Sequence, residues 1–197
     1  MVVAIVTIRL SSLFSGDETA MKRSAAILII VISAAVAFGA QASGDWIKYT
    51  SPEGRYSVLL PAQPKLSTQE AANADGQKFQ QYLAQVNDPT GYYLTGYFDL
   101  LSGDTYSLDK GRDGIIRGVN GALVSEGEIS LGGNPGRELK ISLVGPDKVD
   151  YLVYARMFNI DKRVYILQFI IAKSEDNKAS AANTARFFDS FKTIKTP

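Results

Sequence analysis

The sequence predicts an α+β domain in which helices pack on an antiparallel β-sheet. Several segments after residue 45 are apolar or alternate between apolar and polar residues with a period of two, which is typical of strands. Two other segments place their apolar residues at helical spacing. The order is strand pairs, a helix, four consecutive strands and a closing helix. Strands that follow one another through short turns form hairpins, so the sheet is expected to be antiparallel.

Residues 21–42 have the three parts of a secretory signal peptide in the right order. A basic start at residues 21–23 precedes an apolar run at 25–38 and a small-residue cleavage site between Ala42 and Ser43. The apolar run is shorter than the roughly 20 residues that span a bilayer, which favours cleavage over an uncleaved anchor. We therefore expect a periplasmic or secreted protein with no stable membrane anchor after signal cleavage.

Residues 1–20 precede this signal and carry acidic residues where a signal peptide should begin. We interpret them as a translated upstream extension and Met21 as the true start. Residues 43–197 then form a single domain, which is long enough for one hydrophobic core.

Composition excludes several classes of function. The chain has no His and no Cys, so Ser-His-Asp and Cys-His nucleophile systems, zinc sites with nitrogen and sulfur ligands, and disulfides are excluded. After removal of residues 1–42, 18 basic and 18 acidic residues remain of the 21 and 20 in the whole chain. This neutral balance argues against nucleic acid as a partner. We expect no cofactor and no metal.

The first half of the domain predicts two hairpins separated by a loop. The turn at residues 51–54 joins the first pair, and the turn at 87–91 joins the second. Residues 66–76 are polar and Ala-rich, so we expect a loop there with a helical turn at most. The four expected strands are 46–49, 55–60, 79–86 and 92–100. In the last of them, even-numbered and odd-numbered residues should face opposite sides of the sheet.

Residues 107–120 predict the first helix, with Ser107 as N-cap and Gly121 at the C′ position. The period-two pattern then returns in four strands, at 123–131, 137–144, 151–160 and 164–172. The last two are the most apolar and should form the centre of the sheet. A closing helix follows the capping residues 174–177. Its expected packing stripe is Ala181, Ala185, Phe187, Phe188 and Phe191.

Three motifs resemble those of PsbP-like domains and related exported bacterial proteins. They are Trp46-x-x-Tyr49-x-Ser51-Pro52-Glu53-x-x-Tyr56-Ser57-Val58-x-x-Pro61, Gly133-Asn134-Pro135-Gly136-Arg137-Glu138-Leu139 and Ala185-Arg186-Phe187-Phe188-Asp189-Ser190-Phe191. The similarity covers most of residues 46–192 and implies an α/β/α sandwich. PsbP proteins are lumenal accessory proteins of the oxygen-evolving complex, and a eukaryotic relative binds the GTPase Ran. The resemblance therefore implies an accessory or binding module.

The first helix carries four glycines at spacings of three and four, Gly111, Gly114, Gly118 and Gly121. Each interior glycine costs about 1 kcal/mol relative to Ala, so another interaction should offset it. One interpretation is close packing of this helix on the sheet or a neighbouring helix. The other is a smooth groove for the backbone of a partner.

Arg112 falls among the apolar residues of the same helix, where a guanidinium needs a partner. One interpretation is that Arg112 extends past the apolar edge into solvent or pairs with a carboxylate such as Asp99, and the other is that it holds an anionic ligand. Asp99, Asp104, Asp109 and Asp113 bracket the helix start and could collect Ca²⁺. Helix-dipole complementarity and an Asp113 to Arg117 pair explain them with fewer assumptions.

Taken together, these patterns predict an exported non-enzymatic accessory or binding module. It would interact with a protein partner or a small ligand in the periplasm. The alternative is a carboxylate-based hydrolase of envelope material that uses Asp99, Asp104 or Glu138. The many tyrosines could form a stacking surface, although aromatic residues are ordinary in strands.

Overall fold

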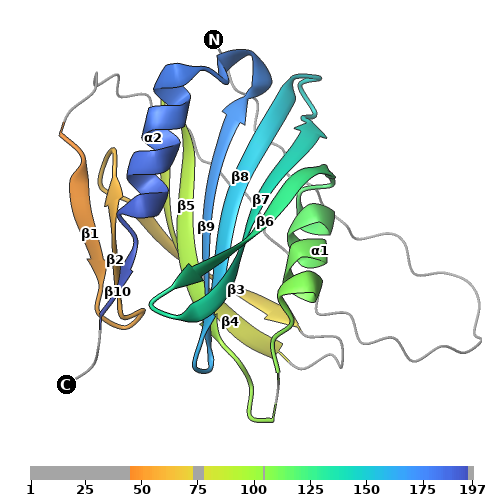
Figure 1. Cartoon of the computed structure of the whole chain (residues 1–197). Helices are drawn as coiled ribbons and strands as arrows, with labels where there is room; N and C mark the ends of the chain where they lie inside the picture. Colours follow the sequence, from red (N-terminus) through yellow and green to blue (C-terminus); the bar gives the residue numbers. More distant parts are fainter. Residues whose placement is uncertain (1–44, 73–77, 104, 195–197) are drawn as a thin grey trace, which may run out of the picture.

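The computed structural model describes residues 45–72, 78–103 and 105–194 (Figure 1). These residues form a large sheet, a small sheet and two α-helices. The predicted signal peptide at 21–42, the predicted cleavage site between Ala42 and Ser43, and Asp104 lie outside the described residues.

The large sheet has seven antiparallel strands in the order β3-β4-β5-β9-β8-β7-β6. Its strands are β3 (Lys65–Ala72), β4 (Lys78–Asp88), β5 (Gly91–Asp99), β6 (Ala122–Leu131), β7 (Asn134–Val144), β8 (Asp150–Ile160) and β9 (Arg163–Ala172). The apolar strands β9 and β8 lie at its centre, as predicted, because both of their faces are covered.

A small sheet joins the two ends of the domain. It consists of β1 (Ile47–Ser51), β2 (Tyr56–Leu60) and β10 (Lys192–Thr193), in the order β1-β2-β10. The β1–β2 hairpin was predicted, and the short strand β10 was not. Because β10 pairs with β2, the last described strand lies beside the second, and the two ends of the described chain meet in one sheet (Figure 1).

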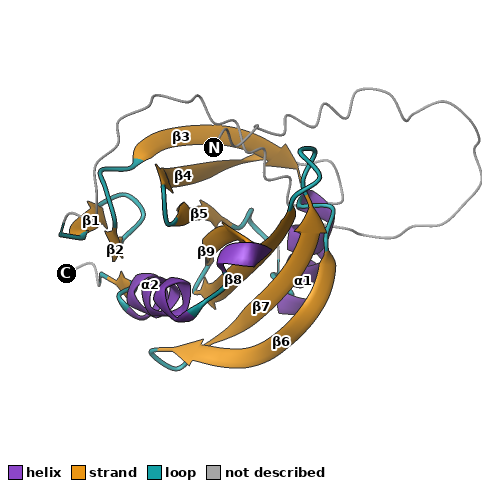
Figure 2. Cartoon of the chain, turned by 90° about the horizontal axis from the view of Figure 1, so that it is seen from above, coloured by secondary structure: helices purple, strands orange, loops and turns teal. Residues whose placement is uncertain are grey.

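The helices cover opposite faces of the large sheet. Figure 2 shows the sheet strongly curved, with α2 (Lys178–Asp189) and the small sheet on its concave side and α1 (Leu108–Gly118) on its convex side. A short 3-10 helix, η1 (Lys173–Glu175), leads into α2. α1 packs on β7 and β8. The predicted α+β class with helices on both sides of an antiparallel sheet is confirmed.

Residues from alternate positions build two hydrophobic cores, one on each face. Leu94 and Phe98 of β5 belong to the convex-side core under α1, and Tyr93 and Tyr97 belong to the concave-side core under α2. The predicted division of this strand into two faces is therefore confirmed.

The ends of α1 follow the predicted signals with one correction. Ser107 is the N-cap, as predicted. The C′ residue is Asn120, with φ of 51°, and Gly121 follows it and donates from its amide to the Ile116 carbonyl at 3.0 Å. The prediction that Gly121 occupies C′ is wrong by one residue, because Asn also tolerates the left-handed conformation. Gly121 is required for contact instead: a Cβ there would lie 2.5 Å from Ile141.

The packing side of α2 differs in part from the prediction. Asn177 caps the helix in a reciprocal capping box with Ser180. The three phenylalanines of the predicted stripe are buried, namely Phe187, Phe188 and Phe191. Ala181 and Ala185 are exposed, so their inclusion in the stripe is wrong. The phenylalanines bury far more apolar area than two alanines, and they determine which side of the helix faces the sheet.

The loop expected at residues 66–76 is wrong over its first part, where the chain forms the edge strand β3. Most side chains of this strand are exposed, so no apolar alternation marks it in the sequence. Its pairing with β4 rests on backbone hydrogen bonds and on polar side-chain pairs. Gln69, for example, donates to Gln81 at 2.6 Å, and Gln85 donates to Ser67 at 3.0 Å.

A candidate binding groove beside Arg156

A groove of about 400 Å³ opens on the concave side of the sheet, next to the end of α2. Its walls come from three elements that are far apart in the sequence. Ile129 and Leu131 lie near the end of β6, Arg156 and Phe158 lie on β8, and Phe188 and Asp189 end α2. The volume is within the range of small-ligand sites in proteins.

The pairing register of the strands brings together the residues at the floor of this groove. Ile129 pairs with Gly136, and Gly136 pairs with Phe158, so the three positions form one row across β6, β7 and β8. Gly136 leaves room for the Phe158 ring, because a Cβ at this position would lie 2.5 Å from that ring. Gly132 and Gly133, with φ of 57° and 84°, form the tight turn that returns the chain from β6 to β7.

Arg156 is the central polar group of the groove. Its Nε donates to Oε2 of Glu138 on the paired strand β7, and its Nη1 donates to Oδ1 of Asp189 at 2.8 Å. The guanidinium carbon lies 4.9 Å from the centre of the Phe188 ring. One guanidinium with two carboxylates therefore fixes the end of α2 against the sheet and leaves the cluster with one net negative charge.

A similar cluster holds the beginning of α2. The carboxylate of Asp176 accepts hydrogen bonds from the Tyr154 hydroxyl at 2.8 Å and from Lys140 Nζ at 3.1 Å. These two donors lower the pKa of Asp176 below its ordinary value. With both of its ends bonded to the sheet, α2 forms a fixed wall of the groove.

Arg112, predicted as a partner-binding residue, lies on the other face of the sheet. Its Nε donates to Asp113 at 2.9 Å, and its Nη1 lies 3.2 Å from Oε2 of Glu126 on β6. The structure therefore supports carboxylate pairing for Arg112, but with partners other than Asp99. Asp99 is bound by Arg163 at the start of β9. Asp113 is likewise bonded by Arg112 rather than by the expected Arg117.

Gly111 of α1 packs closely against its neighbours. A Cβ at Gly111 would lie 2.0 Å from the Tyr106 hydroxyl and 2.9 Å from the Met157 sulfur. Gly114 is also buried, and Gly118 is partly buried. At Gly111 the close-packing interpretation fits the structure. A partner-binding role for the stripe stays a prediction.

Other predicted features do not assemble into a site. Among residues 45–72, 78–103 and 105–194, no three acidic side chains converge as metal ligands. Of the tyrosines considered as a stacking surface, Tyr82 is exposed and its ring stacks on Tyr97 at 4.9 Å, while the rest are buried or partly buried. No helix in the part of the chain that the structure describes is long and apolar enough to span a bilayer.

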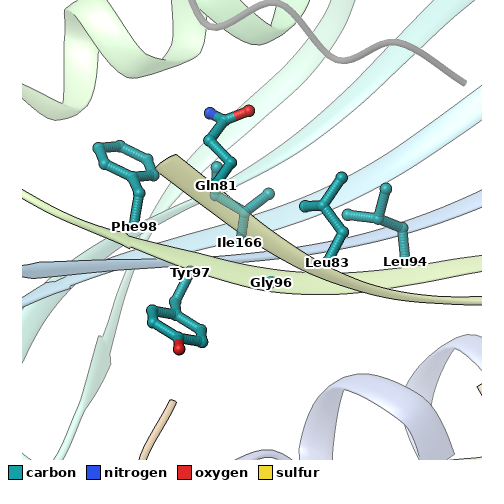
Figure 3. Close-up of a pocket in the computed structure, with 7 residues that line it drawn as sticks. All are labelled: Gln81, Leu83, Leu94, Gly96, Tyr97, Phe98 and Ile166. Atoms are coloured by element: carbon teal, nitrogen blue, oxygen red, sulfur yellow. The ribbon is translucent and has the colours of Figure 1, made fainter. Parts of the chain in front are cut away.

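A second, much smaller hollow lies between β4, β5 and β9 on the convex side (Figure 3). Leu83, Leu94, Phe98 and Ile166 point to this side of the sheet, whereas Tyr97 points to the other. Its volume of about 10 Å³ is the size of one water molecule. This hollow is therefore too small for an organic ligand.

Sequence reasoning did not identify the groove as a site. A signal was present in Arg156, which is the one charged residue within the apolar segment 151–160. A charge in a central strand needs buried or partly buried partners, and such clusters often mark functional sites. From the sequence, Asp189 was noted only as part of the PsbP-like motif at residues 185–191, and Phe188 only as part of that motif and of the packing stripe of the closing helix.

Comparisons with known proteins show which known fold this chain resembles. No protein-family model and no curated protein matches the sequence. The solution structure of cyanobacterial PsbP from Synechocystis sp. PCC 6803 is similar, with a TM-score of 0.54 and 11% identity, over 81% of this chain and 98% of that chain. A Pseudomonas aeruginosa protein of unknown function, PA94, has a TM-score of 0.41 and 8% identity over 78% of this chain and 99% of that chain. The fold is PsbP-like, as the sequence motifs predicted.

Proposed function

We propose that this chain is an exported, non-enzymatic binding module, and that the groove beside Arg156 is its contact site in the periplasm. The observation that carries the proposal is the make-up of the groove, in which apolar walls lie beside the Arg156 guanidinium and the Asp189 carboxylate, and Glu138 holds Arg156 from the neighbouring strand. Concave apolar sites with a few fixed polar groups are typical of binding sites. The PsbP-like motifs agree with an accessory role, and the predicted signal peptide supports export.

The positions of the candidate catalytic carboxylates favour binding over hydrolysis. Asp99 lies on β5 and Glu138 on β7, with β9 and β8 between them. Three strand spacings alone place them at least about 14 Å apart. Glycosidases need their two carboxyl groups about 5 to 9.5 Å apart. In addition, each of the two carboxylates is already bonded to an arginine.

The proposal is tested by crosslinked affinity purification of the tagged protein from its own cells. The decisive comparison is between Leu131→Gln, which removes an apolar wall of the groove, and Leu123→Gln at the other end of β6. Leu123 is 40% exposed and does not line the groove. We expect wild type and Leu123→Gln to capture the same protein or small molecule, and Leu131→Gln to lose it.

Equal capture by both variants would show that the groove is not the contact site. Hydrolysis of cell-wall material by the purified protein, abolished by Glu138→Gln, would establish the hydrolase alternative instead. Export is tested separately, by cell fractionation and N-terminal sequencing. A periplasmic protein that begins at Ser43 is the expected result, and a cytoplasmic protein with residues 21–42 intact would contradict it.

A further inference from the structure

The charged groups at the groove point to the kind of ligand that it accepts. Glu138 binds Arg156 through Oε2 and Asp189 binds it through Oδ1. The second oxygen of each carboxylate, Oε1 of Glu138 and Oδ2 of Asp189, accepts no hydrogen bond within the part of the chain that the structure describes. Both side chains are partly open to solvent, at 46% and 66% exposure. Two acceptor oxygens are thus available beside an apolar groove.

An anionic ligand would be disfavoured at this position. To reach Arg156 it would have to displace one of two carboxylates that already neutralise the guanidinium, and the remaining carboxylates would repel it. A cation would be favoured there, because the cluster of Arg156, Glu138 and Asp189 carries one net negative charge and has free acceptor oxygens. Ammonium and guanidinium groups make their strongest hydrogen bonds with carboxylates.

The rest of the groove requires an apolar group next to that cation. Ile129, Leu131 and Phe158 contribute aliphatic and aromatic surface, and the volume of about 400 Å³ is at the low end for a ligand site. Such a space suits one or two side chains better than a large molecule.

We propose that the groove binds a segment of a partner protein in which an apolar or aromatic side chain lies next to a lysine or arginine. This inference rests on the proposed binding function and specifies its ligand. A protein segment is favoured because Ile129 and Leu131 belong to β6, which lies at the edge of the sheet. The outward backbone groups of an edge strand can bond to a peptide, whereas a small amine would use the groove alone.

The test measures the binding of three blocked dipeptides that differ only in charge. Phe-Lys, Phe-Gln and Phe-Glu, each acetylated and amidated, are titrated into ¹⁵N-labelled protein and followed by NMR. We expect Phe-Lys to bind about tenfold more tightly than Phe-Glu, with Phe-Gln between them. The amide shifts should gather at Ile129, Leu131 and Asp189. Phenethylamine, which has the ring and the cation without a peptide backbone, should bind more weakly than Phe-Lys.

Two variants with the same change in net charge provide the control. Asp189→Asn removes a charge at the groove, and Asp150→Asn removes one at the start of β8. Six residues of strand, roughly 20 Å, separate Asp150 from Arg156. We expect Asp189→Asn to reduce the preference for Phe-Lys over Phe-Glu to about threefold and Asp150→Asn to leave it unchanged. Because Asp189 is exposed at a helix C-terminus, its replacement should not impair folding.

Several results would overturn the inference. They are equal binding of Phe-Lys and Phe-Glu, the same response of both variants, an absence of shifts at the groove, or binding of phenethylamine as tight as that of Phe-Lys. Its failure can be told apart from failure of the proposed function. If Leu131→Gln still abolishes capture of a partner from cells while the dipeptides show no charge preference, the groove is a contact site but its ligand is not cationic.

Discussion

Arg163 binds the carboxylate of Asp99 through two parallel hydrogen bonds, from Nε at 2.6 Å and from Nη2 at 2.7 Å. A third bond runs from Nη1 to the Glu53 carbonyl at 2.6 Å, and the guanidinium stacks on Tyr97 at 4.4 Å. Arg163 itself is only 8% exposed. One side chain therefore joins the start of β9, the end of β5 and the turn between β1 and β2.

Replacement of Arg163 by Ala should lower the free energy of unfolding by about 2 to 3 kcal/mol, because it leaves the Glu53 carbonyl without its bond and removes a nearly buried packed group. Asp99→Asn should lower it by less than about 1 kcal/mol, since the Asp99 side chain is 56% exposed. Urea unfolding of both variants measures the two values. A larger loss for Asp99→Asn than for Arg163→Ala would contradict this assignment.

Gly111→Ala should destabilise the protein, although Ala is the better helix former. The added Cβ would lie 2.0 Å from the Tyr106 hydroxyl, and overpacking of this kind costs about 1 to 3 kcal/mol. Gly127→Ala is the control, because nothing lies within 4 Å of a Cβ at that position. It should be neutral or slightly stabilising. Thermal unfolding that shows a higher melting temperature for Gly111→Ala would exclude close packing there.

Gln168→Met should stabilise the protein. Gln168 is fully buried in the central strand β9, and neither Oε1 nor Nε2 has a hydrogen-bond partner among the residues described. A buried polar group without a partner costs about 1 to 3 kcal/mol, and Met fills a similar volume. Gln81→Met is the matched control, since Gln81 is equally buried but accepts a bond from Gln69. Chemical denaturation should show opposite signs for the two variants.

Alkaline pH should unfold the protein between about pH 10 and 12. Burial raises the pKa of Tyr92, Tyr93 and Tyr151 to about 12, from an ordinary value of 10.0. A raised pKa in the folded state means that the stabilisation is complete below pH 10 and is lost as pH rises toward 12.

Circular dichroism and the absorbance of tyrosinate, recorded through the same titration, test this prediction. Tyr93→Phe should raise the pH at which half of the protein is unfolded. Tyr82→Phe, at an exposed position, should leave that pH unchanged. Ionisation of all tyrosines near pH 10 without unfolding would show that these side chains are not buried.

Local patterns predicted most of the elements but not the edge strand β3 or the short strand β10. The hairpins, Ser107 as N-cap and the central position of β8 and β9 all follow from short stretches of sequence. Strand β3 was missed because its side chains are polar and exposed, and its pairing depends on the backbone of β4. Gly121 was placed at C′ instead of Asn120 because both residue types accept the left-handed conformation. Ala181 and Ala185 were also wrongly placed on the packing side of α2.

Partners distant in the sequence could not be predicted in the same way. Asp99 was matched with Arg112, which follows it closely in the sequence, whereas its partner Arg163 is 64 residues away. The groove likewise combines β6, β8 and the end of α2. Spacing along the chain does not tell which strand lies beside which. These contacts could therefore be identified only once the strand order was known.

The sequence by itself determined the α+β class, the two faces of β5 and the exclusion of His and Cys chemistry, because composition and periodicity act locally. Only the tertiary structure decided which charges meet and where an apolar groove remains open. Arg156, Glu138 and Asp189 come together through strand register and the packing of α2, and both result from burial summed over the whole domain.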